Sequence, residues 1–371
     1  MTLATESIAP KSYYDADIFL QEHQDVFQKH WQFVGFTEQL AHANDYITKR
    51  IGNVPVLVQN IQGELHALLN VCSHRKATLQ TEASGNRVLR CPYHCWSYGK
   101  QGKLVSVPQE RSDFAFNQEQ REQLSLKQFA LERCGSFVFV RVAAEGESLK
   151  SFLGDYYKVL ESLSEYFIDP IESGKYLWQT NWKLAVETVL EVYHVPGVHP
   201  ESFVKLAKPS CEITKQGKHN TGTTPLQGTP QKWWAGVRKH LKLSQHPELT
   251  EYDHFFIYPN MAIGLTNGSL MSVQTYNPID ATTSQLDFSL RMVKRKDGAN
   301  TSTAVKAAVQ DNFISFNHTT LEEDRVIAES CQGNMAISDS PGVLGLCEDR
   351  LAHFHQSWRD DTHAQARVWN E

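Results

Sequence analysis

Hydrophobic residues along this chain follow first a helical period, then a strand period, and then both. Within residues 15–36, apolar side chains recur at the spacing of one helix face: Leu20, Phe27, Trp31 and Val34. This pattern predicts an amphipathic helix that packs on a larger body. From Tyr46 to about Val142 the pattern changes to short β-rich runs broken by Gly, Asn and Pro, which predicts an all-β module.

A second module begins where helical periodicity returns after the β-rich runs. The string NWKLAVETVLEVYHV predicts a helix that ends or kinks at the Pro196-Gly197 break. Three apolar runs between residues 254 and 293 predict antiparallel strands. Helical patterns follow from about Ser302 to Cys331 and from about Cys347, so we expect the second module to be α+β.

Residues 208–250 are polar and turn-rich but contain Trp233 and Trp234, so we expect a mobile segment with an aromatic contact. A chain of 371 residues, 41% of them hydrophobic, fits two cores better than one. The expected parts are an N-terminal helix, an all-β domain and an α+β domain on which that helix packs: residues 1–37, 38–145 and 146–371.

Charge and cysteine usage exclude several classes of protein. The formal net charge of -6, from 36 basic and 42 acidic residues, offers no basic stripe for nucleic acid or a membrane surface. The N-terminus lacks a basic start and an apolar run, so we expect a cytoplasmic protein with no membrane segment. Seven cysteines in such a chain favour metal binding over a disulfide framework.

Two short Cys/His loops form the first candidate metal site. Cys72 and His74 are separated from Cys91 and His94 by sixteen residues, and each pair follows a β-rich run. Two thiolates and two imidazoles can hold one tetrahedral zinc ion, or a [2Fe-2S] cluster with the cysteines on one iron and the histidines on the other. The spacing alone leaves both readings open.

A second candidate site lies near the Pro196-Gly197 break. Glu191 and His194 are three residues apart on the expected helix, and His199 follows just beyond the break, so both imidazoles can point at one metal ion. This spacing is not specific by itself.

Both segments resemble those in the catalytic alpha subunits of Rieske non-haem iron oxygenases. VCSHRKATL and CPYHCWSYGKQGKL resemble the paired loops of Rieske proteins, and the run from Asn181 to Pro200 resembles the mononuclear-iron segment. The resemblance extends from HWQFVGF to AHFHQSW. It implies an N-terminal all-β Rieske [2Fe-2S] domain and a C-terminal helix-grip catalytic domain, in which an antiparallel sheet carries helices.

The resemblance also implies the ligands of the cluster. Cys72 and Cys91 would bind one iron, and His74 and His94 would bind the outer iron near the surface. The sequence departs from the common pattern after His94, where Cys95 replaces a small or polar residue. We interpret Cys95 as a packing thiol. A second departure is Lys76, where glycine is frequent.

For the mononuclear Fe(II), the resemblance implies two histidines and one carboxylate, His194, His199 and Asp324. Such a triad leaves adjacent positions open for dioxygen beside a substrate. Asp324 belongs to the acidic run of residues 322–324, which would otherwise be a solvated helix face. Glu323 is the main alternative ligand, whereas Glu322 is expected to face elsewhere.

Glu191 carries two further implications. Relatives place a carboxylate there to bridge the two centres across a subunit boundary, so an electron would pass from His74 or His94 through a neighbouring Glu191 to His194. Glutamate at this position, with the string EVYH, is similar to the carnitine, glycine betaine and choline monooxygenase branch. Thr188, where many ring dioxygenases carry asparagine, weakens the ring-dihydroxylation alternative.

The resulting expectation is an oxygenase component that hydroxylates or N-demethylates a small molecule with O2, in a homotrimer or a multiple of it. No nucleotide-binding fingerprint is present, so electrons should come from NAD(P)H through a separate flavin and iron-sulfur reductase. A non-catalytic electron carrier and a zinc-stabilised binding module remain alternatives. Aromatic residues that could line the substrate pocket, or simply pack in the core, are Trp233, Trp234, Tyr252, Phe255, Phe256 and Tyr258.

Overall fold

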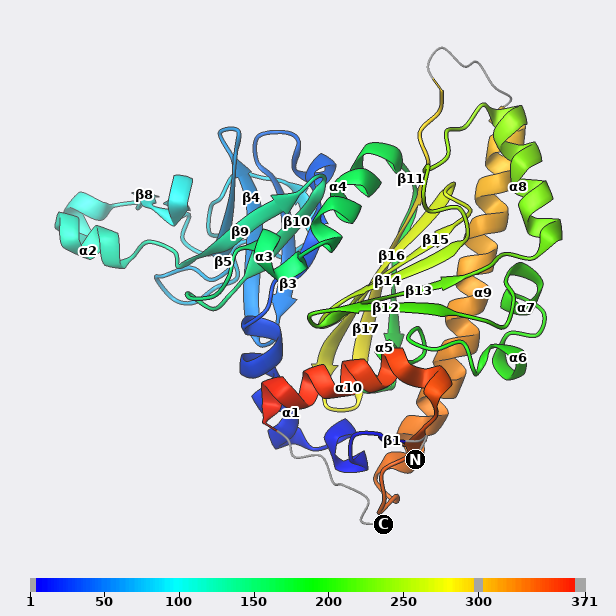
Figure 1. Cartoon of the computed structure of the whole chain (residues 1–371). Coiled ribbons are helices and arrows are strands. Elements are labelled where there is room, and N and C mark those ends of the chain that lie inside the picture. Colours follow the sequence, from blue (N-terminus) through cyan, green and yellow to red (C-terminus); the bar gives the residue numbers. More distant parts are fainter. Residues whose placement is uncertain (1–4, 297–302, 364–371) are drawn as a thin grey trace. The chain divides into compact units, whose positions relative to one another are not determined.

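The structure is a computed structural model that describes residues 5–296 and 303–363 (Figure 1). Contacts within the chain define two compact units. One spans Glu22–Phe152, and the other joins the residues up to Gln21 to those from Leu153 onward. The expected domain boundaries after residues 37 and 145 remain a prediction, because compactness alone does not show which segments fold together.

The unit of residues 22–152 is built on one antiparallel sheet of seven strands in the order β2-β10-β9-β5-β4-β3-β6. The all-β expectation for this region is confirmed. Its strands are β2 (Gln32–Phe36), β3 (Asp45–Ile51), β4 (Val54–Ile61), β5 (Glu64–Leu69), β6 (Ser84–Asn86), β9 (Gln128–Cys134) and β10 (Phe137–Arg141). A hairpin of β7 (Ser97–Tyr98) and β8 (Leu104–Ser106) is followed by the helix α2 (Gln118–Gln123).

Both cysteines of the candidate cluster loops belong to the apolar core of this unit. Cys72 and Cys91 are each 1% exposed and lie in one cluster with the buried side chains of Leu57, Leu68 and Trp96. Burial of these apolar groups fixes the bases of the two loops, because a close-packed core permits little displacement.

The second unit contains another seven-stranded antiparallel sheet, in the order β11-β17-β16-β15-β14-β13-β12. Its strands are β11 (Asp169–Trp178), β12 (Glu212–Gln216), β13 (His219–Thr224), β14 (Tyr252–Ile257), β15 (Met261–Thr266), β16 (Leu270–Asp280) and β17 (Thr283–Met292). The antiparallel strands expected between residues 254 and 293 are therefore confirmed, although the first of the three runs forms two strands, β14 and β15. A two-stranded pair joins β1 (Thr5–Glu6) to β18 (Val343–Leu344).

Helices accompany this sheet, as an α+β fold requires (Figure 1). They are α1 (Ala16–Glu22), α4 (Tyr156–Tyr166), α5 (Trp182–Glu187), α6 (Val195–Val198), α7 (Phe203–Leu206), α8 (Gly228–Leu241), α9 (Thr303–Met335) and α10 (Asp349–Thr362). The helix α3 (Leu149–Leu153) lies where one unit ends and the other begins in the sequence. The long helix α9 confirms the late helical pattern, although its expected start at Ser302 lies outside the described residues.

The helix expected over residues 15–36 was wrong in its second half. The α-helix α1 ends at Glu22 and continues as a π-helical segment only to Gln28, and residues 32–36 form the strand β2. Phe36 pairs with Phe137 of β10. Pairing with a sheet edge decides the conformation here, because tertiary contacts override a helical periodicity of only a few residues.

Residues 208–250 contain more regular structure than their turn-rich composition suggests, and the expected mobility of this segment stays a prediction. This stretch forms two strands of the second sheet, β12 and β13, and the fourteen-residue helix α8. Trp233 and Trp234 are adjacent on α8, with ring centroids 4.8 Å apart, and Trp234 is buried.

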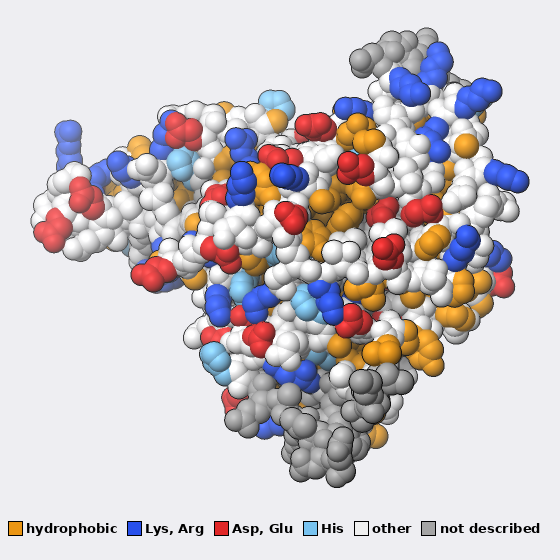
Figure 2. Space-filling model, viewed as in Figure 1, with side chains coloured by type: hydrophobic (Ala, Val, Ile, Leu, Met, Phe, Trp, Pro, Cys, Tyr) orange, Lys and Arg blue, Asp and Glu red, His pale blue; other side chains and the backbone are white. Residues whose placement is uncertain are grey.

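The distribution of charged side chains on the surface agrees with the similar numbers of basic and acidic residues in the sequence. Acidic and basic side chains are interspersed on the face viewed in Figure 2. Among the described residues, none of the helices combines the length and the apolar character that crossing a bilayer requires.

The helix α10 docks on the second unit through Phe354, which is fully buried. Its ring packs edge-on against Trp182, at 5.8 Å, and Phe256, at 5.6 Å. We predict that Phe354→Ala lowers the free energy of unfolding by about 3–5 kcal/mol, because the substitution leaves a cavity. Gln356→Ala, at an exposed position of the same helix, should change it by less than about 0.5 kcal/mol. Denaturant unfolding of both variants checks this, and equal effects would contradict it.

Candidate metal centres

The two Cys/His loops share one backbone conformation. In the first loop the Cys72 N–H donates to the Ala77 carbonyl (2.8 Å), and the Lys76 N–H donates to the Cys72 carbonyl (3.0 Å). The second loop repeats both bonds around Cys91, at 2.8 and 3.1 Å. Each loop therefore presents its cysteine and its histidine in the same way.

The two departures from the common pattern fall at equivalent positions of these loops. Lys76 and Cys95 both adopt left-handed backbone angles, with φ of 61° and 60°. Glycine adopts this conformation without steric cost, which explains why a glycine or a small residue suits it. The Cys95 side chain is exposed, so the interpretation as a packing thiol was wrong.

The cysteine side chains lie in a dry, hydrogen-bonded environment. The Tyr98 hydroxyl lies 3.2 Å from the Cys72 Sγ and accepts the Ser73 N–H at 3.1 Å. Burial raises the pKa of the Cys72 thiol. A sulfur that must ionise in such a place calls for a cationic partner, and metal ions supply one.

The histidines of the two loops face each other. The ring centroids of His74 and His94 are 4.6 Å apart, and His74 stacks on Trp96 at 4.7 Å. The buried Nδ1 of His74 has no hydrogen-bond partner among the described residues. A buried ring nitrogen without a hydrogen-bond partner, beside a second imidazole, fits a metal ligand.

The spacing of the donor atoms separates zinc from a cluster. Ligands of a single tetrahedral zinc ion lie within about 4 Å of one another. Among the described residues, the group of three or more donors that all lie within 4.8 Å is His194, His199 and Asp324, not the Cys/His loops. A cluster with two irons fits better, because its cysteines and histidines bind different irons.

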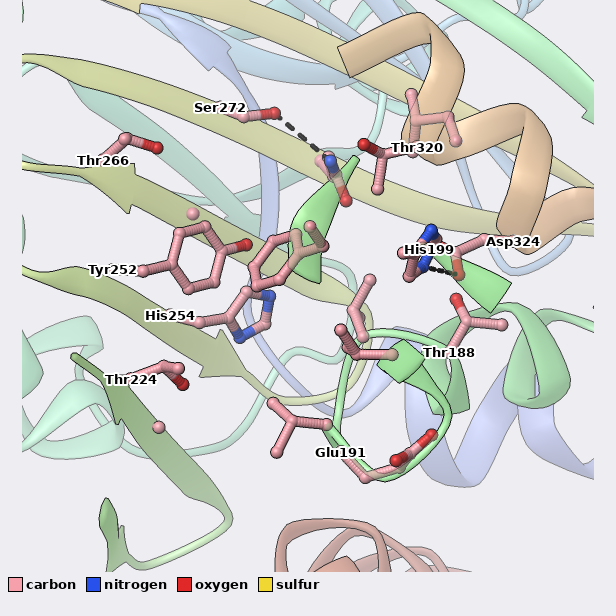
Figure 3. A pocket seen from close by; sticks show the side chains of 18 of the residues that line it. Thr188, Glu191, His199, Thr224, Tyr252, His254, Thr266, Ser272, Thr320 and Asp324 are labelled. Carbon is pink, nitrogen blue, oxygen red and sulfur yellow. Dashed lines mark hydrogen bonds and ion pairs between the residues drawn. The ribbon is translucent and has the colours of Figure 1, made fainter. Parts of the chain in front are cut away.

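The second centre brings together the three residues expected from the sequence. The His199 Nε2 lies 3.0 Å from the Asp324 Oδ1, and the His194 Nε2 lies 3.6 Å from the same oxygen. His199 and Asp324 are almost fully buried, and Figure 3 shows the contact between their side chains. Two imidazoles and one carboxylate around one point form the donor set of a non-haem Fe(II) site.

Each imidazole of this centre is oriented by a glutamate. The His194 Nδ1 is hydrogen-bonded to the Glu191 carboxylate, and the His199 Nδ1 lies 2.7 Å from the Glu323 Oε2. The Ser202 hydroxyl donates to the same Glu323 oxygen at 2.7 Å. An outer carboxylate holds the proton on Nδ1, which leaves the Nε2 lone pair free for a metal ion.

The helix expected over residues 181–195 is not continuous. The helix α5 ends at Glu187, and the short helix α6 contains the Pro196-Gly197 pair that was expected to break a helix. The Glu191 carboxylate accepts the backbone N–H groups of Tyr193 and His194, the latter at 3.0 Å. It therefore caps the turn ahead of α6, where proline is favoured because the first N–H groups lack helical partners.

The helix α9 supplies the carboxylate because one of its faces lines the pocket. Phe313, Asn317, Thr320 and Asp324 recur at helical spacing along this face. Farther along α9, Gln332 accepts the Asn181 N–H at 2.8 Å and fixes the helix against the start of α5.

Burial and neighbouring charges shift the pKa values of the groups in this centre in opposite directions. Burial raises the pKa of the Asp324 carboxyl, and the hydrogen bond with His199 offsets part of that rise. For His199, burial lowers the pKa, but hydrogen bonds and charges of Asp324 and Glu323 outweigh it and raise the pKa above its usual value.

A pocket opens onto these ligands, and its aromatic lining differs from the expected one. Of the six aromatic candidates only Tyr252 lines it. Trp233 and Trp234 line a different hollow, whereas the remaining three candidates are buried core residues. Other aromatic side chains of the pocket are Phe203, Phe313 and Phe316.

The positions of two residues at the site were not predicted from the sequence. Glu323 was weighed as a ligand, whereas the structure makes it the partner of His199. Arg350 was not considered, because nothing in its local sequence distinguishes a cation on α10 that reaches the pocket from an ordinary surface arginine.

Comparison with known families agrees with this geometry. Residues 154–363, more than half of the chain, match the ring hydroxylating alpha subunit (catalytic domain). The chain belongs to this family. Residues 30–130 match the Rieske [2Fe-2S] domain. The expected resemblance to Rieske oxygenase alpha subunits and the expected two-domain fold class are thus confirmed, and a [2Fe-2S] cluster with a mononuclear non-haem iron are the cofactors of such domains.

Curated relatives include both monooxygenases and dioxygenases. The glycine betaine monooxygenase oxygenase subunit of Chromohalobacter salexigens is 34% identical over 53% of this chain and 43% of its own length. The anthranilate 1,2-dioxygenase large subunit of Acinetobacter baylyi is 34% identical over 52% and 42%. The chain thus spans less than half the length of these two relatives. The chloroplastic choline monooxygenase of Beta vulgaris is 26% identical over 96% and 77%.

Solved structures support the fold. The quaternary ammonium Rieske monooxygenase CntA in complex with an inhibitor superimposes with a TM-score of 0.79, at 20% identity and 95% coverage of both chains. Naphthalene 1,2-dioxygenase from Rhodococcus sp. gives 0.74, at 18% identity. At these identities the likeness shows a shared fold, common to monooxygenase and dioxygenase subunits.

The pairing of His199 with Glu323 generates a prediction. We expect Glu323→Gln to weaken Fe(II) binding about 10- to 100-fold, because the outer carboxylate no longer orients the ring and raises its basicity. Competition with a calibrated chelator measures this affinity. Glu322→Gln is the matched control, since Glu322 pairs with Arg325 on the exposed side of α9. Unchanged iron affinity in Glu323→Gln would remove Glu323 from the centre.

Proposed function

We propose that this chain is the oxygenase component of a multicomponent Rieske non-haem iron oxygenase that hydroxylates a small organic molecule. The observation that carries the proposal is the convergence of His194, His199 and Asp324 at the wall of a buried pocket. A non-catalytic electron carrier would not need this second centre, and a zinc-binding module would not need two sets of ligands.

In this proposal Cys72, Cys91, His74 and His94 hold the cluster, and His194, His199 and Asp324 hold the iron. The bound iron supplies the oxidation of the substrate by dioxygen. The protein holds each histidine as the Nδ1–H form through Glu191 and Glu323. Buried walls exclude bulk water, and the pocket positions the substrate beside the ligands.

The substrate class is a further part of the proposal. Relatives named for glycine betaine and choline favour a quaternary ammonium compound, and aromatic faces of Phe203, Tyr252 and Phe316 can attract such a cation. The anthranilate relative favours an aromatic substrate. Oxygen uptake coupled to a reductase, measured over a panel of both classes, separates them.

We further propose that the oxygenase is a homotrimer, or a multiple of it, in the cytoplasm, supplied with electrons from NAD(P)H by a separate flavin and iron-sulfur reductase. Two features of the surface support electron entry at the cluster loops. His74 and His94 are only half-buried, and Tyr93, whose ring centroid lies 3.7 Å from that of His94, is 55% exposed.

Asp324→Ala tests the mononuclear site. We expect this variant to lose all turnover and the mononuclear iron, about one iron in three, while the visible absorption of the cluster persists. Iron analysis together with absorption spectroscopy checks both. Asp311→Ala removes an exposed carboxylate from the same helix and should retain full iron. Full iron in Asp324→Ala would show that the ligand assignment is wrong.

Glu191→Ala tests the proposed bridge between subunits. With Fe(II) supplied in excess, to offset the loss of the partner of His194, we expect both metals to be bound, but reoxidation of the reduced protein by dioxygen with substrate to slow at least tenfold, which is about 1.4 kcal/mol. Stopped-flow absorption in a single turnover measures this rate. Glu201→Ala, which removes an exposed carboxylate nearby, should leave it unchanged. A normal rate in Glu191→Ala would refute the bridge.

A further inference from the structure

Arg350 places an uncompensated positive charge in the wall of the same pocket. Its side chain is 3% exposed. Among the described residues no carboxylate forms an ion pair with it, and its hydrogen-bond acceptors are neutral: Asn220 Oδ1 at 2.8 Å, His254 Nδ1 at 2.7 Å and the His254 carbonyl at 3.3 Å. Buried arginines are usually paired with an anion, because removing a charge from water is costly.

The guanidinium keeps two N–H groups unused. A guanidinium has five N–H donors, and the bonds to Asn220 and His254 occupy Nε and Nη2. Nη1 donates to no described residue. It lies beside Gly222, where an added Cβ would fall 2.6 Å from Nη1. Glycine at this position thus leaves room for the free end of the guanidinium.

The described side chains around Arg350 offer further donors and no carboxylate, and the Cys211 thiol lies beside Gly222 as Nη1 does. Burial and the charge of Arg350 lower the pKa of His254 well below its usual value, so this ring is neutral. Since its Nδ1 accepts from Arg350, the proton resides on Nε2. Burial raises the pKa of the Tyr252 hydroxyl, which therefore remains a donor. Burial lowers the pKa of Arg350 to about 10, so it stays charged at neutral pH.

The sheet aligns these groups on one face. Tyr252 and His254 are two residues apart on β14 and point to the same side. Gly222 on β13 and Gly264 on β15 are the cross-strand partners of His254, so no side chain flanks its ring in either neighbouring strand. Figure 3 shows Tyr252 and His254 on the opposite side of the pocket from His199 and Asp324.

The acidic groups of the pocket do not neutralise this cation. Glu191 and Asp324, both in the pocket lining, are hydrogen-bonded to the imidazoles of the metal centre. We propose that Arg350, assisted by His254 and Tyr252, is a carboxylate-binding subsite, and that the natural substrate carries a carboxylate at the end remote from the carbon that is oxidised. This inference rests on the proposed oxygenase function and specifies its substrate class.

A test that does not depend on turnover uses calorimetric binding to the iron-loaded protein. The probes are two matched pairs, glycine betaine with choline and benzoate with benzyl alcohol, in which only the carboxylate is replaced by a hydroxymethyl group. We expect the wild-type protein to bind the carboxylate of at least one pair about tenfold or more tightly than its alcohol, because bonds to a charged group are the stronger ones. No preference for a carboxylate in either pair would overturn the proposal.

Substitutions then assign the preference to Arg350. Arg350→Met should abolish it, with a loss of about 10- to 100-fold in carboxylate affinity and little change for the alcohol. Arg350→Lys should retain part of it, since the charge remains without the planar fork. Gly222→Ala should weaken carboxylate binding by displacing Nη1, without removing any charge. Arg359→Met removes an arginine of the same helix that donates to the Ser7 carbonyl, and it should leave the preference intact.

A structural role for Arg350 makes a different set of predictions. In that case Arg350→Met and Arg350→Lys would lower the melting temperature while folded protein kept the wild-type ratio of carboxylate to alcohol affinity, and the proposal would fail. Failure of the oxygenase function is recognised separately, because iron-loaded protein would then bind the carboxylates but consume no dioxygen.

Discussion

The mononuclear metal centre depends on one constraint, which is that a glutamate holds each of its two imidazoles at Nδ1. Glu191 holds His194 and Glu323 holds His199, so both Nε2 atoms turn toward the single carboxylate of Asp324. Without these outer partners either ring could flip or carry its proton on Nε2, which would block a metal ion. The fold supports this arrangement. The helix α9 supplies two adjacent acids, Glu323 and Asp324, which contact the two ring nitrogens of His199. The capped turn before α6 fixes His194.

The pocket separates its charges along its length. Glu191 and Asp324 lie at the metal centre, where imidazoles bind them. Arg350, the arginine of the lining among the described residues, is held by neutral partners on β13 and β14. Opposite charges in a dry site attract strongly unless they are kept apart, so their separation must be maintained by the rigid sheet and by α9. A substrate with a polarity of its own would therefore bind in one direction, which would place the same carbon beside the iron in every turnover.

Local spacing and distant packing differed in how well the sequence predicted them. The Cys72 and Cys91 loops could be predicted because a Cys/His pair and its turn lie within a few residues. Asp324 needed a family resemblance, since a run of three acids does not show which one faces inward. The predicted helix across Glu191 was wrong because the Glu191 side chain competes for backbone N–H groups and forms a cap. Arg350 could not be predicted, because its burial results from α10 packing against strands more than a hundred residues away.

The cap formed by Glu191 links the conformation of the turn to the orientation of the His194 ring. The same carboxylate accepts the N–H groups of residues 193 and 194 and holds the ring of His194. A change in the conformation of this turn must therefore move the imidazole, and a change at the imidazole must strain the turn, because one side chain satisfies both. Tyr193, at the tip of the turn, is 71% exposed. A partner surface that presses on the tip would thus reach the metal centre through two covalently linked residues, with no need for a longer pathway through the core.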